Sequence, residues 1–88
     1  MHFVYIVRCA DGTLYTGYAR DPQKRADVHN NGRGARYTAG RRPVRLVYFE
    51  ACGSAGEALR RECQVKRWSR MRKEALIAAR GLRPHAAS

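Results

Sequence analysis

Residues 3–19 read FVYIVRCADGTLYTGYA, and this stretch decides the fold. Its two ends, residues 3–9 and 13–19, are rich in Val, Ile, Tyr and Thr, the residue types that favour strands. Between them stands Ala10-Asp11-Gly12, which is a strong signal for a tight turn between two strands. The stretch therefore predicts an antiparallel β-hairpin.

The length of the hairpin loop decides where Tyr5 and Tyr15 point. A two-residue turn at Asp11-Gly12 places the two tyrosines on opposite faces of the sheet. A three-residue loop, with Gly12 in the left-handed conformation, pairs Tyr5 with Gly17, and both tyrosine rings then share one face as diagonal neighbours. The apolar pattern does not separate the two registers, so both stay open at the level of sequence.

The rest of the chain predicts one more strand and three helices. Residues 31–43 are rich in Gly and Arg and lack periodicity, so we expect a binding loop there. The element order β-β-α-β-α-α indicates an α+β fold, a three-stranded antiparallel sheet with helices packed on it. We expect one domain over residues 1–82 and a frayed tail over 83–88. The expected elements are a helix from Pro22 to His29, a strand within Val44–Ala51, a helix from Ala55 to about Trp68 after a capping box at Ser54 and Glu57, and a helix from Ser69 to near Gly81.

Composition points to a polyanionic partner. The chain has 88 residues, with 18 Lys plus Arg against 7 Asp plus Glu, a formal net charge of +11. Most of these cations are arginines, whose planar guanidinium matches phosphate oxygens, so the excess favours nucleic acid over a membrane surface. No apolar run is long enough for a membrane span, and we expect a cytoplasmic protein. The cysteines, Cys9, Cys52 and Cys63, lack zinc-ligand spacing and are interpreted as core residues in a reducing compartment.

Glu62 is the carboxylate that the pattern singles out. The other six acidic residues suit turns, helix starts, helix surfaces or a strand, whereas Glu62 falls in a stripe that should face the sheet. A carboxylate there needs a partner, and taken alone it favours an ion pair with an arginine over a metal ion. Arg25 and His29 lie one turn apart on one helix face, although a solvated arginine and a helix-end histidine would look the same. The stripe consists of Ala55, Ala58, Leu59, Glu62 and Val65.

Several of these residues together resemble the GIY-YIG nuclease family. The resemblance rests on Phe3-Val4-Tyr5 and Tyr15-Thr16-Gly17, ten residues apart, followed by Arg25, His29-Asn30 and Glu62, and it covers nearly the whole chain. Phe3, Val4 and Thr16 replace the glycine and the two isoleucines of the signature triplets. Three further segments resemble the small single-domain members and the catalytic domain of the Slx-type structure-selective endonucleases: His29-Asn30-x-Gly32-x-Gly34-Ala35-x-Tyr37-Thr38, Arg41-Arg42-Pro43-Val44 and Ala58-Leu59-Arg60-Arg61-Glu62.

The resemblance implies hydrolysis of phosphodiester bonds with one divalent metal ion, Mg²⁺ or Mn²⁺. Glu62 would hold the ion, mostly through a shell of water. Tyr15 would position or deprotonate the attacking water, and Tyr5 would support that site. Arg25 would steady charge on the phosphate, and His29 would assist proton transfer or bind phosphate.

The implied substrate is DNA in branched or single-stranded form, in repair or recombination, with structure rather than sequence preference; RNA stays open. The rival hypothesis is a nucleic-acid-binding module with the same fold and no turnover, and no protein partner is identifiable. The predicted backbone contacts are Arg33, Arg36, Arg41, Arg42, Lys66, Arg67 and Arg70.

Overall fold

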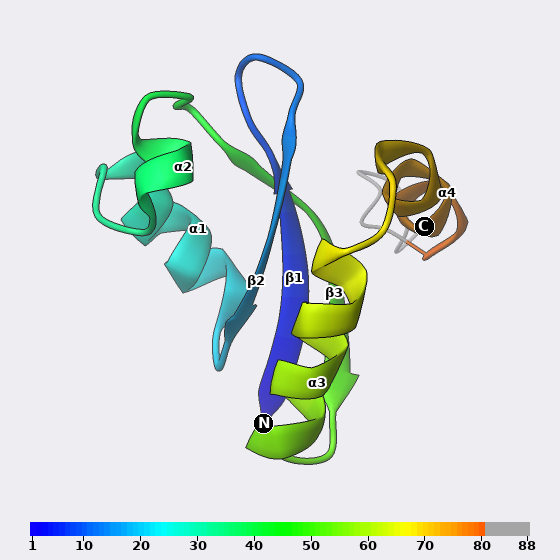
Figure 1. Cartoon of the computed structure of the whole chain (residues 1–88). Helices are drawn as coiled ribbons and strands as arrows, with labels where there is room; N and C mark the ends of the chain where they lie inside the picture. Colours follow the sequence, from blue (N-terminus) through cyan, green and yellow to red (C-terminus); the bar gives the residue numbers. More distant parts are fainter. Residues whose placement is uncertain (81–88) are drawn as a thin grey trace, which may run out of the picture.

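The computed structural model describes residues 1–80, and its secondary structure confirms the α+β prediction. The three strands form one antiparallel sheet in which the first strand is central and the second and third are the edges. Figure 1 shows the sheet between two pairs of helices. The elements are β1 (His2–Arg8), β2 (Leu14–Ala19), α1 (Pro22–Asn30), α2 (Arg36–Ala39), β3 (Arg45–Cys52), α3 (Ala55–Lys66) and α4 (Arg70–Arg80).

The hairpin closes through a three-residue loop. The Cys9 amide donates to the Thr13 carbonyl at 2.8 Å, and Gly12, with a φ of 86°, donates to the Cys9 carbonyl at 2.9 Å. Tyr5 therefore pairs with Gly17 and Val7 with Tyr15. The register that the sequence left open is the one that places both tyrosines on the same face of the sheet.

The two faces of the sheet carry separate hydrophobic clusters. On the face of the tyrosines, α1 contributes Ala26, and the loop before β3 contributes Val44. On the other face, α3, α4 and the segment between them cover Ile6 and Tyr48 through Val65, Trp68, Leu76 and Ile77. The sheet thus separates α1 and α2 from α3 and α4 (Figure 1). The first cluster consists of Tyr5, Val7, Cys9, Ala19, Ala26 and Val44, with Tyr15 and Leu46 against it.

Local signals placed the helix starts correctly. The Asp21 carboxylate accepts from the Lys24 amide at 3.1 Å, and the Ser54 hydroxyl accepts from the Glu57 amide at 3.1 Å, as expected of N-caps. The last helix begins at Arg70, with the Ser69 hydroxyl accepting from the Arg72 amide. Its predicted end at Gly81 and the expected tail, residues 83–88, lie outside the described residues.

Three expectations are wrong. Residues 36–39, expected as loop, form α2, a single helical turn too short to show periodicity in sequence. Leu59 is half exposed, because α3 turns Ala58 and Val65 inward and Leu59 falls beside that buried line. Cys63 is exposed on α3 rather than part of the core, while Cys9 is buried.

Across residues 1–80, no helix combines the length and the apolar character needed to cross a membrane.

Gly12 is the residue on which the register depends, so its replacement tests the hairpin. Gly12→Ala should lower the free energy of unfolding by about 1–2 kcal/mol, because alanine resists the left-handed conformation. The added methyl meets only a guanidinium nitrogen of Arg70 at 3.9 Å, so crowding contributes little. The matched control is Gly40→Ala, whose added methyl meets nothing within 4 Å at a negative φ. Urea unfolding of the three proteins measures the effect; equal losses would contradict it.

Candidate active site

The centre of the candidate site is a buried hydrogen-bonded chain that starts at Tyr5. The Tyr5 hydroxyl lies 2.7 Å from Nε2 of His29, and Nδ1 of the same ring lies 2.8 Å from the Thr38 hydroxyl. Tyr5 is 1% exposed, and His29 and Thr38 are fully buried. The three residues come from β1, α1 and α2, so the chain ties the hairpin to the helices on its face.

The direction of these hydrogen bonds follows from Thr38. Its hydroxyl has one proton, which it donates to the Ala35 carbonyl at 3.1 Å. The Thr38 oxygen must then accept from Nδ1–H of His29, which leaves Nε2 as an acceptor. The Tyr5 hydroxyl therefore donates to His29, and the histidine is the neutral tautomer with its proton on Nδ1.

Two glycines make room for this pair. A Cβ on Gly17 would lie 2.4 Å from the Tyr5 hydroxyl, and a Cβ on Gly34 would lie 2.1 Å from Nδ1 of His29. Neither ring can withdraw, because both are enclosed by protein. Gly17, from the second signature triplet, and Gly34, from the Gly-rich segment, are therefore needed for close approach.

Burial keeps both members of the pair uncharged. It raises the pKa of Tyr5 to about 12, an effect that a hydrogen bond with Arg25 and the positive charge of Arg25 partly oppose and the negative charge of Glu62 reinforces. Burial, and secondly the charge of Arg25, lower the pKa of His29. A neutral phenol donating to a neutral imidazole is the form that these shifts favour at neutral pH.

Tyr15 lies beside the pair but is more open. Its ring meets the His29 ring edge-on at 5.2 Å and stacks on Tyr37 at 5.8 Å. Arg41 covers the other side of this group, 4.1 Å from the Tyr37 ring centre, and its guanidinium also binds Asp11 at 3.1 Å. Tyr15 is therefore half-buried at the edge of the enclosed pair.

Glu62 comes from α3, which packs on the opposite face of the sheet. Lys66 of the same helix nevertheless lies 5.7 Å above the Tyr15 ring. The Glu62 charge contributes to the raised pKa of Tyr5, so the carboxylate is within electrostatic reach of that tyrosine. Glu62 is 17% exposed and pairs with Lys66 at 3.0 Å. The ion pair is thus with a lysine one turn along the helix, not with an arginine.

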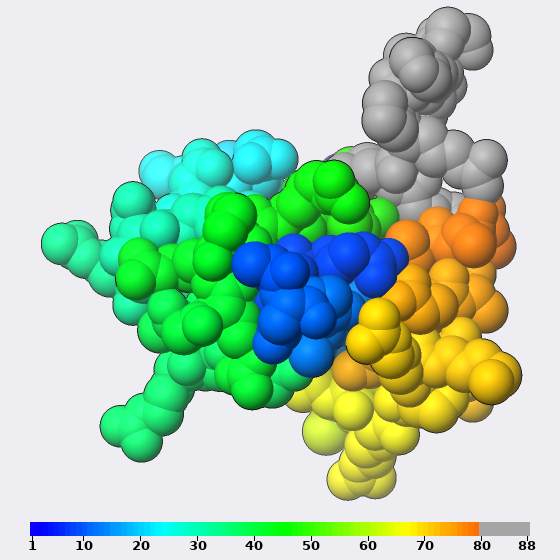
Figure 2. Space-filling view, turned by 90° about the horizontal axis from the view of Figure 1, so that it is seen from above, coloured from blue at the N-terminus to red at the C-terminus, as the bar shows by residue number. Residues whose placement is uncertain are grey.

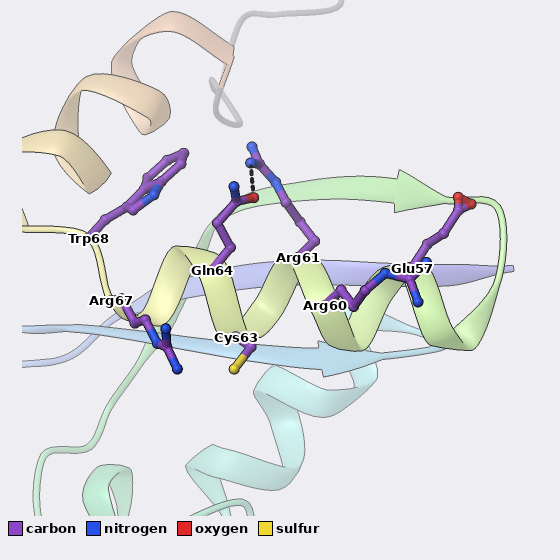
Figure 3. Close-up of a pocket in the computed structure, with 7 residues that line it drawn as sticks. All are labelled: Glu57, Arg60, Arg61, Cys63, Gln64, Arg67 and Trp68. Carbon is purple, nitrogen blue, oxygen red and sulfur yellow. Dashed lines mark hydrogen bonds between the residues drawn. The ribbon is translucent and has the colours of Figure 1, made fainter.

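The neighbouring residue on α3 orients Glu62. Arg61 forms two hydrogen bonds to the Glu50 carboxylate of β3, at 2.9 and 3.2 Å, and a third to Gln64 that Figure 3 draws as a dashed line. Successive residues of a helix point about 100° apart. With Arg61 held towards β3, Glu62 is directed towards β2. The cavity of about 740 Å³ in Figure 3 is lined by residues of α3 and by Arg67 and Trp68 after it, and neither tyrosine lines it.

Arg25 joins the site from α1. Its guanidinium donates to the Gly34 carbonyl at 2.9 Å, and its charge acts on both Tyr5 and His29. A groove of about 520 Å³ beside it is also lined by Arg20 and Lys24. These two cations were not among the predicted contacts. Arg20 and Lys24 are four residues apart and Lys24 is next to Arg25, and this grouping of basic residues was the sequence signal for a binding surface there.

The predicted backbone contacts fall into two groups. Arg41 and Arg42 hold the 31–43 segment together, since Arg42 donates to the carbonyls of Ala39 and Asn30 and Arg41 binds Asp11. Arg70 pairs with Glu74 and Lys66 with Glu62. The segment 31–45 and the α3–α4 connection lie on either side of the hairpin tip in Figure 2. Of the predicted contacts, three are exposed and form neither an ion pair nor a side-chain hydrogen bond within residues 1–80, namely Arg33, Arg36 and Arg67.

The donor set around Glu62 suits one kind of metal ion. Within residues 1–80, no three His, Cys, Asp or Glu side chains gather into a ready-made metal site. Mg²⁺ and similar hard cations bind through one or two carboxylates, several waters and substrate phosphates. A single, mostly buried carboxylate beside a basic surface fits such an ion when nucleic acid supplies the remaining oxygens.

Comparison with known proteins places this site in a family. The family model described as the GIY-YIG catalytic domain matches residues 1–75. The chain therefore belongs to the GIY-YIG family and carries a nuclease-type domain. The matched range contains the five predicted catalytic positions, Tyr5, Tyr15, Arg25, His29 and Glu62.

Close relatives share this small domain over nearly their whole length. The UPF0213 protein of Staphylococcus saprophyticus is 56% identical over 77 residues, covering 88% of this chain and 94% of that protein. The UPF0213 protein of Staphylococcus aureus strain Mu3 is 54% identical, covering 90% and 96%. The NMR structure of a UPF0213 protein from Bacillus halodurans is 49% identical, with a TM-score of 0.59 over 91% of this chain and 85% of that one. Their names state no activity.

The lowered pKa of His29 makes stability depend on pH. In the unfolded chain a histidine takes up a proton below about pH 6.5, whereas folded His29 resists it. The unfolded state then binds more protons, so this contribution is complete above that pH and is lost as the pH falls. Urea unfolding between about pH 7.5 and pH 5 should show a decline of at most about 1.4 kcal/mol per pH unit from this group. His29→Gln should be less stable at neutral pH but show a flatter decline; identical slopes would contradict this assignment.

Proposed function

We propose that this protein is a divalent-metal-dependent endonuclease that hydrolyses phosphodiester bonds in DNA. The observation that supports it most is the hairpin register, which gathers Tyr5 and Tyr15 on one face with His29, while the charge of Glu62 acts on Tyr5. Membership of the GIY-YIG family gives the nuclease class. The metal, the substrate form and each residue's role are part of this proposal.

The environments of the two tyrosines suggest different roles. Tyr5 is enclosed, donates its proton to His29 and has a raised pKa, so it is a poor base in this state. Tyr15 is partly exposed and faces the basic surface, which suits a group that orients or deprotonates the attacking water. Tyr5 then acts by holding the ring of His29, against which Tyr15 packs.

Arg25 and Glu62 would act on opposite sides of the scissile phosphate. Arg25 is fixed by the Gly34 carbonyl, and its remaining donors can stabilise charge on the phosphate. Glu62 would hold one divalent cation, which supplies Lewis-acid polarisation of the phosphate when bound. His29 is bonded at both ring nitrogens, so we assign it to positioning Tyr5 and Tyr15 rather than to direct phosphate binding.

Backbone charge rather than base contacts should govern binding. Figure 2 shows the segment 31–45, which contains Arg33 and Arg36, and the α3–α4 connection, which contains Arg67, on either side of the hairpin tip. Arg20 and Lys24 line the groove beside Arg25. Such contacts recognise the shape of the phosphate backbone and not the base sequence. We therefore propose structure-selective action on branched or single-stranded DNA, with RNA as a further substrate class to be tested, in a cytoplasmic protein.

Cleavage of labelled DNA in Mg²⁺ or Mn²⁺ tests the activity. Tyr15→Phe removes the hydroxyl that contacts water, and Glu62→Ala removes the metal ligand, so each should reduce the rate by about 100-fold or more. The matched control is Glu57→Ala, which changes the net charge equally on the exposed start of the same helix. It should cleave within a few-fold of the parent.

The outcomes separate the enzyme from its rival. Cleavage that survives in Glu62→Ala refutes the metal-ligand assignment, because residues 1–80 hold no other ready-made group of His, Cys, Asp or Glu side chains that could take the ion. Binding of DNA by the parent without cleavage in either metal supports a non-catalytic binding module instead.

Salt dependence tests the binding surface. The logarithm of the binding constant for duplex DNA falls linearly with the logarithm of salt concentration, and each phosphate contact adds roughly 0.9 to the steepness of that line. Arg36→Met should therefore flatten the plot by up to about one unit, while Arg36→Lys should leave it nearly unchanged. Fluorescence anisotropy with labelled duplex and single-stranded DNA, in the absence of metal, gives both slopes. Equal slopes for Arg36→Met and the parent would remove Arg36 from the interface.

A further inference from the structure

Lys66 occupies a place beside Glu62 that a divalent cation would need. Its ammonium lies 3.0 Å from Oε2 of Glu62. Because Glu62 is largely enclosed, few directions of approach to its oxygens remain, and the ammonium takes one of them. In the structure the candidate metal ligand is therefore already neutralised by a cation of the same chain.

The pairing of Lys66 with Glu62 is selective. The other buried or half-buried carboxylates in residues 1–80 have arginine partners, since Glu50 binds Arg61 and Glu74 binds Arg8. Lys66 is the cation left to Glu62, one helical turn away. Within the described residues, the candidate metal ligand is thus ion-paired with a lysine, whose compact ammonium on a flexible stem exchanges partners more easily than a forked guanidinium.

The surroundings of Lys66 favour its departure once another anion is present. Lys73 of α4 is half-buried nearby, and burial and secondly the charge of Lys66 lower the pKa of Lys73. The two cations therefore repel each other. Lys66 also stands 5.7 Å above the ring of Tyr15, so a phosphate placed at the Tyr15 hydroxyl is within reach of its ammonium.

A divalent cation and the Lys66 ammonium cannot share Glu62 without strong repulsion at such short range. Binding of the metal ion must therefore displace Lys66. Without nucleic acid, the displaced ammonium has water as its new partner and Lys73 as a repelling neighbour. With nucleic acid, a backbone phosphate can take it.

We propose that Lys66 couples metal binding to nucleic-acid binding at this site. In the free protein its ammonium neutralises Glu62, and on binding of nucleic acid it transfers to a backbone phosphate, which frees the carboxylate for the divalent cation. The inference rests on the proposed nuclease function for the identity of the ligands. Its consequence is that metal alone binds weakly, and that metal and nucleic acid strengthen each other's binding by the same factor.

Mn²⁺ binding to the free protein tests the first half of the proposal. The measurement is the electron paramagnetic resonance signal of unbound Mn²⁺ during titration, which needs no cleavage. Lys66→Met keeps the apolar stem over Tyr15 and removes the competing ammonium, so the Mn²⁺ dissociation constant should fall about two- to fivefold. Thermal unfolding confirms that each variant is folded.

The matched control is Lys73→Met. It removes a neighbouring ammonium and the same net charge but leaves the Lys66–Glu62 pair in place. Its Mn²⁺ affinity should change clearly less than that of Lys66→Met. An equal gain in Mn²⁺ affinity in the two variants would show that only the net charge matters, and it would overturn the proposal. An unchanged Mn²⁺ affinity in Lys66→Met would also overturn it. So would the absence of measurable Mn²⁺ binding in all of the proteins, with or without DNA.

The coupling itself is measured with labelled duplex DNA in a Tyr15→Phe background, which prevents cleavage under the proposed mechanism. Mn²⁺ should lower the dissociation constant for DNA in this background. Adding Lys66→Met should make the factor by which Mn²⁺ lowers it smaller. An undiminished factor overturns the coupling. If the parent cleaves no DNA in any metal, the nuclease proposal fails, while the Mn²⁺ titrations still decide the role of Lys66.

Discussion

The close approach of Tyr5 to the backbone of Gly17 is the constraint on which the site depends. It exists only in the register set by the three-residue loop at Gly12, because a shift of one residue would turn one tyrosine to the opposite face. Once Tyr5 lies flat over Gly17, its hydroxyl can reach His29, and His29 in turn can reach Thr38. A local backbone conformation thus determines a hydrogen-bonded chain through three elements.

The strong positive charge is divided between structural and available groups. Arg8, Arg41 and Arg61 are ion-paired and hold α4, the 31–43 segment and α3 in place. Exposed arginines such as Arg33 and Arg67 have no acidic partner among residues 1–80. The scarce carboxylates are therefore used mainly to order arginines, and Glu62, paired with a lysine, is the one whose partner is most easily exchanged. The net charge indicates the class of ligand. The ion pairs within the protein indicate which lysines and arginines are available to bind that ligand.

Sequence reasoning succeeded where local chemistry decides the outcome. The hairpin, the caps at Asp21 and Ser54, and the grouping of Arg25 with His29 follow from turn residues and helical spacing. It could not choose the hairpin register, because both registers bury similar apolar residues. It also placed Leu59 inside and missed the links of Thr38 to His29 and of Lys66 to Glu62. The exposure of Leu59 depends on how α3 rotates over the sheet, which Arg61 and Glu50 decide from different parts of the chain. The link of Thr38 to His29 needs α2, a single turn that shows no periodicity in sequence. Lys66 and Glu62 lie one helical turn apart, and that spacing was the available signal for their pair.

The departures from the family signature are explained by the two faces of the sheet. Tyr5, Tyr15 and Gly17 share the face of α1, where the hydroxyls and the close approach are needed, and all three are present. Val4 and Thr16 point to the opposite face, towards α3, where shape matters more than chemistry. Thr16 even buries a hydroxyl that has no hydrogen-bond partner in the described residues, a cost that an aliphatic side chain would avoid. Val4 and Thr16 lie on the far side of the sheet, and Phe3 packs against Phe49 at the end of the sheet. Several signature residues can therefore be replaced while the geometry of the two tyrosines is kept.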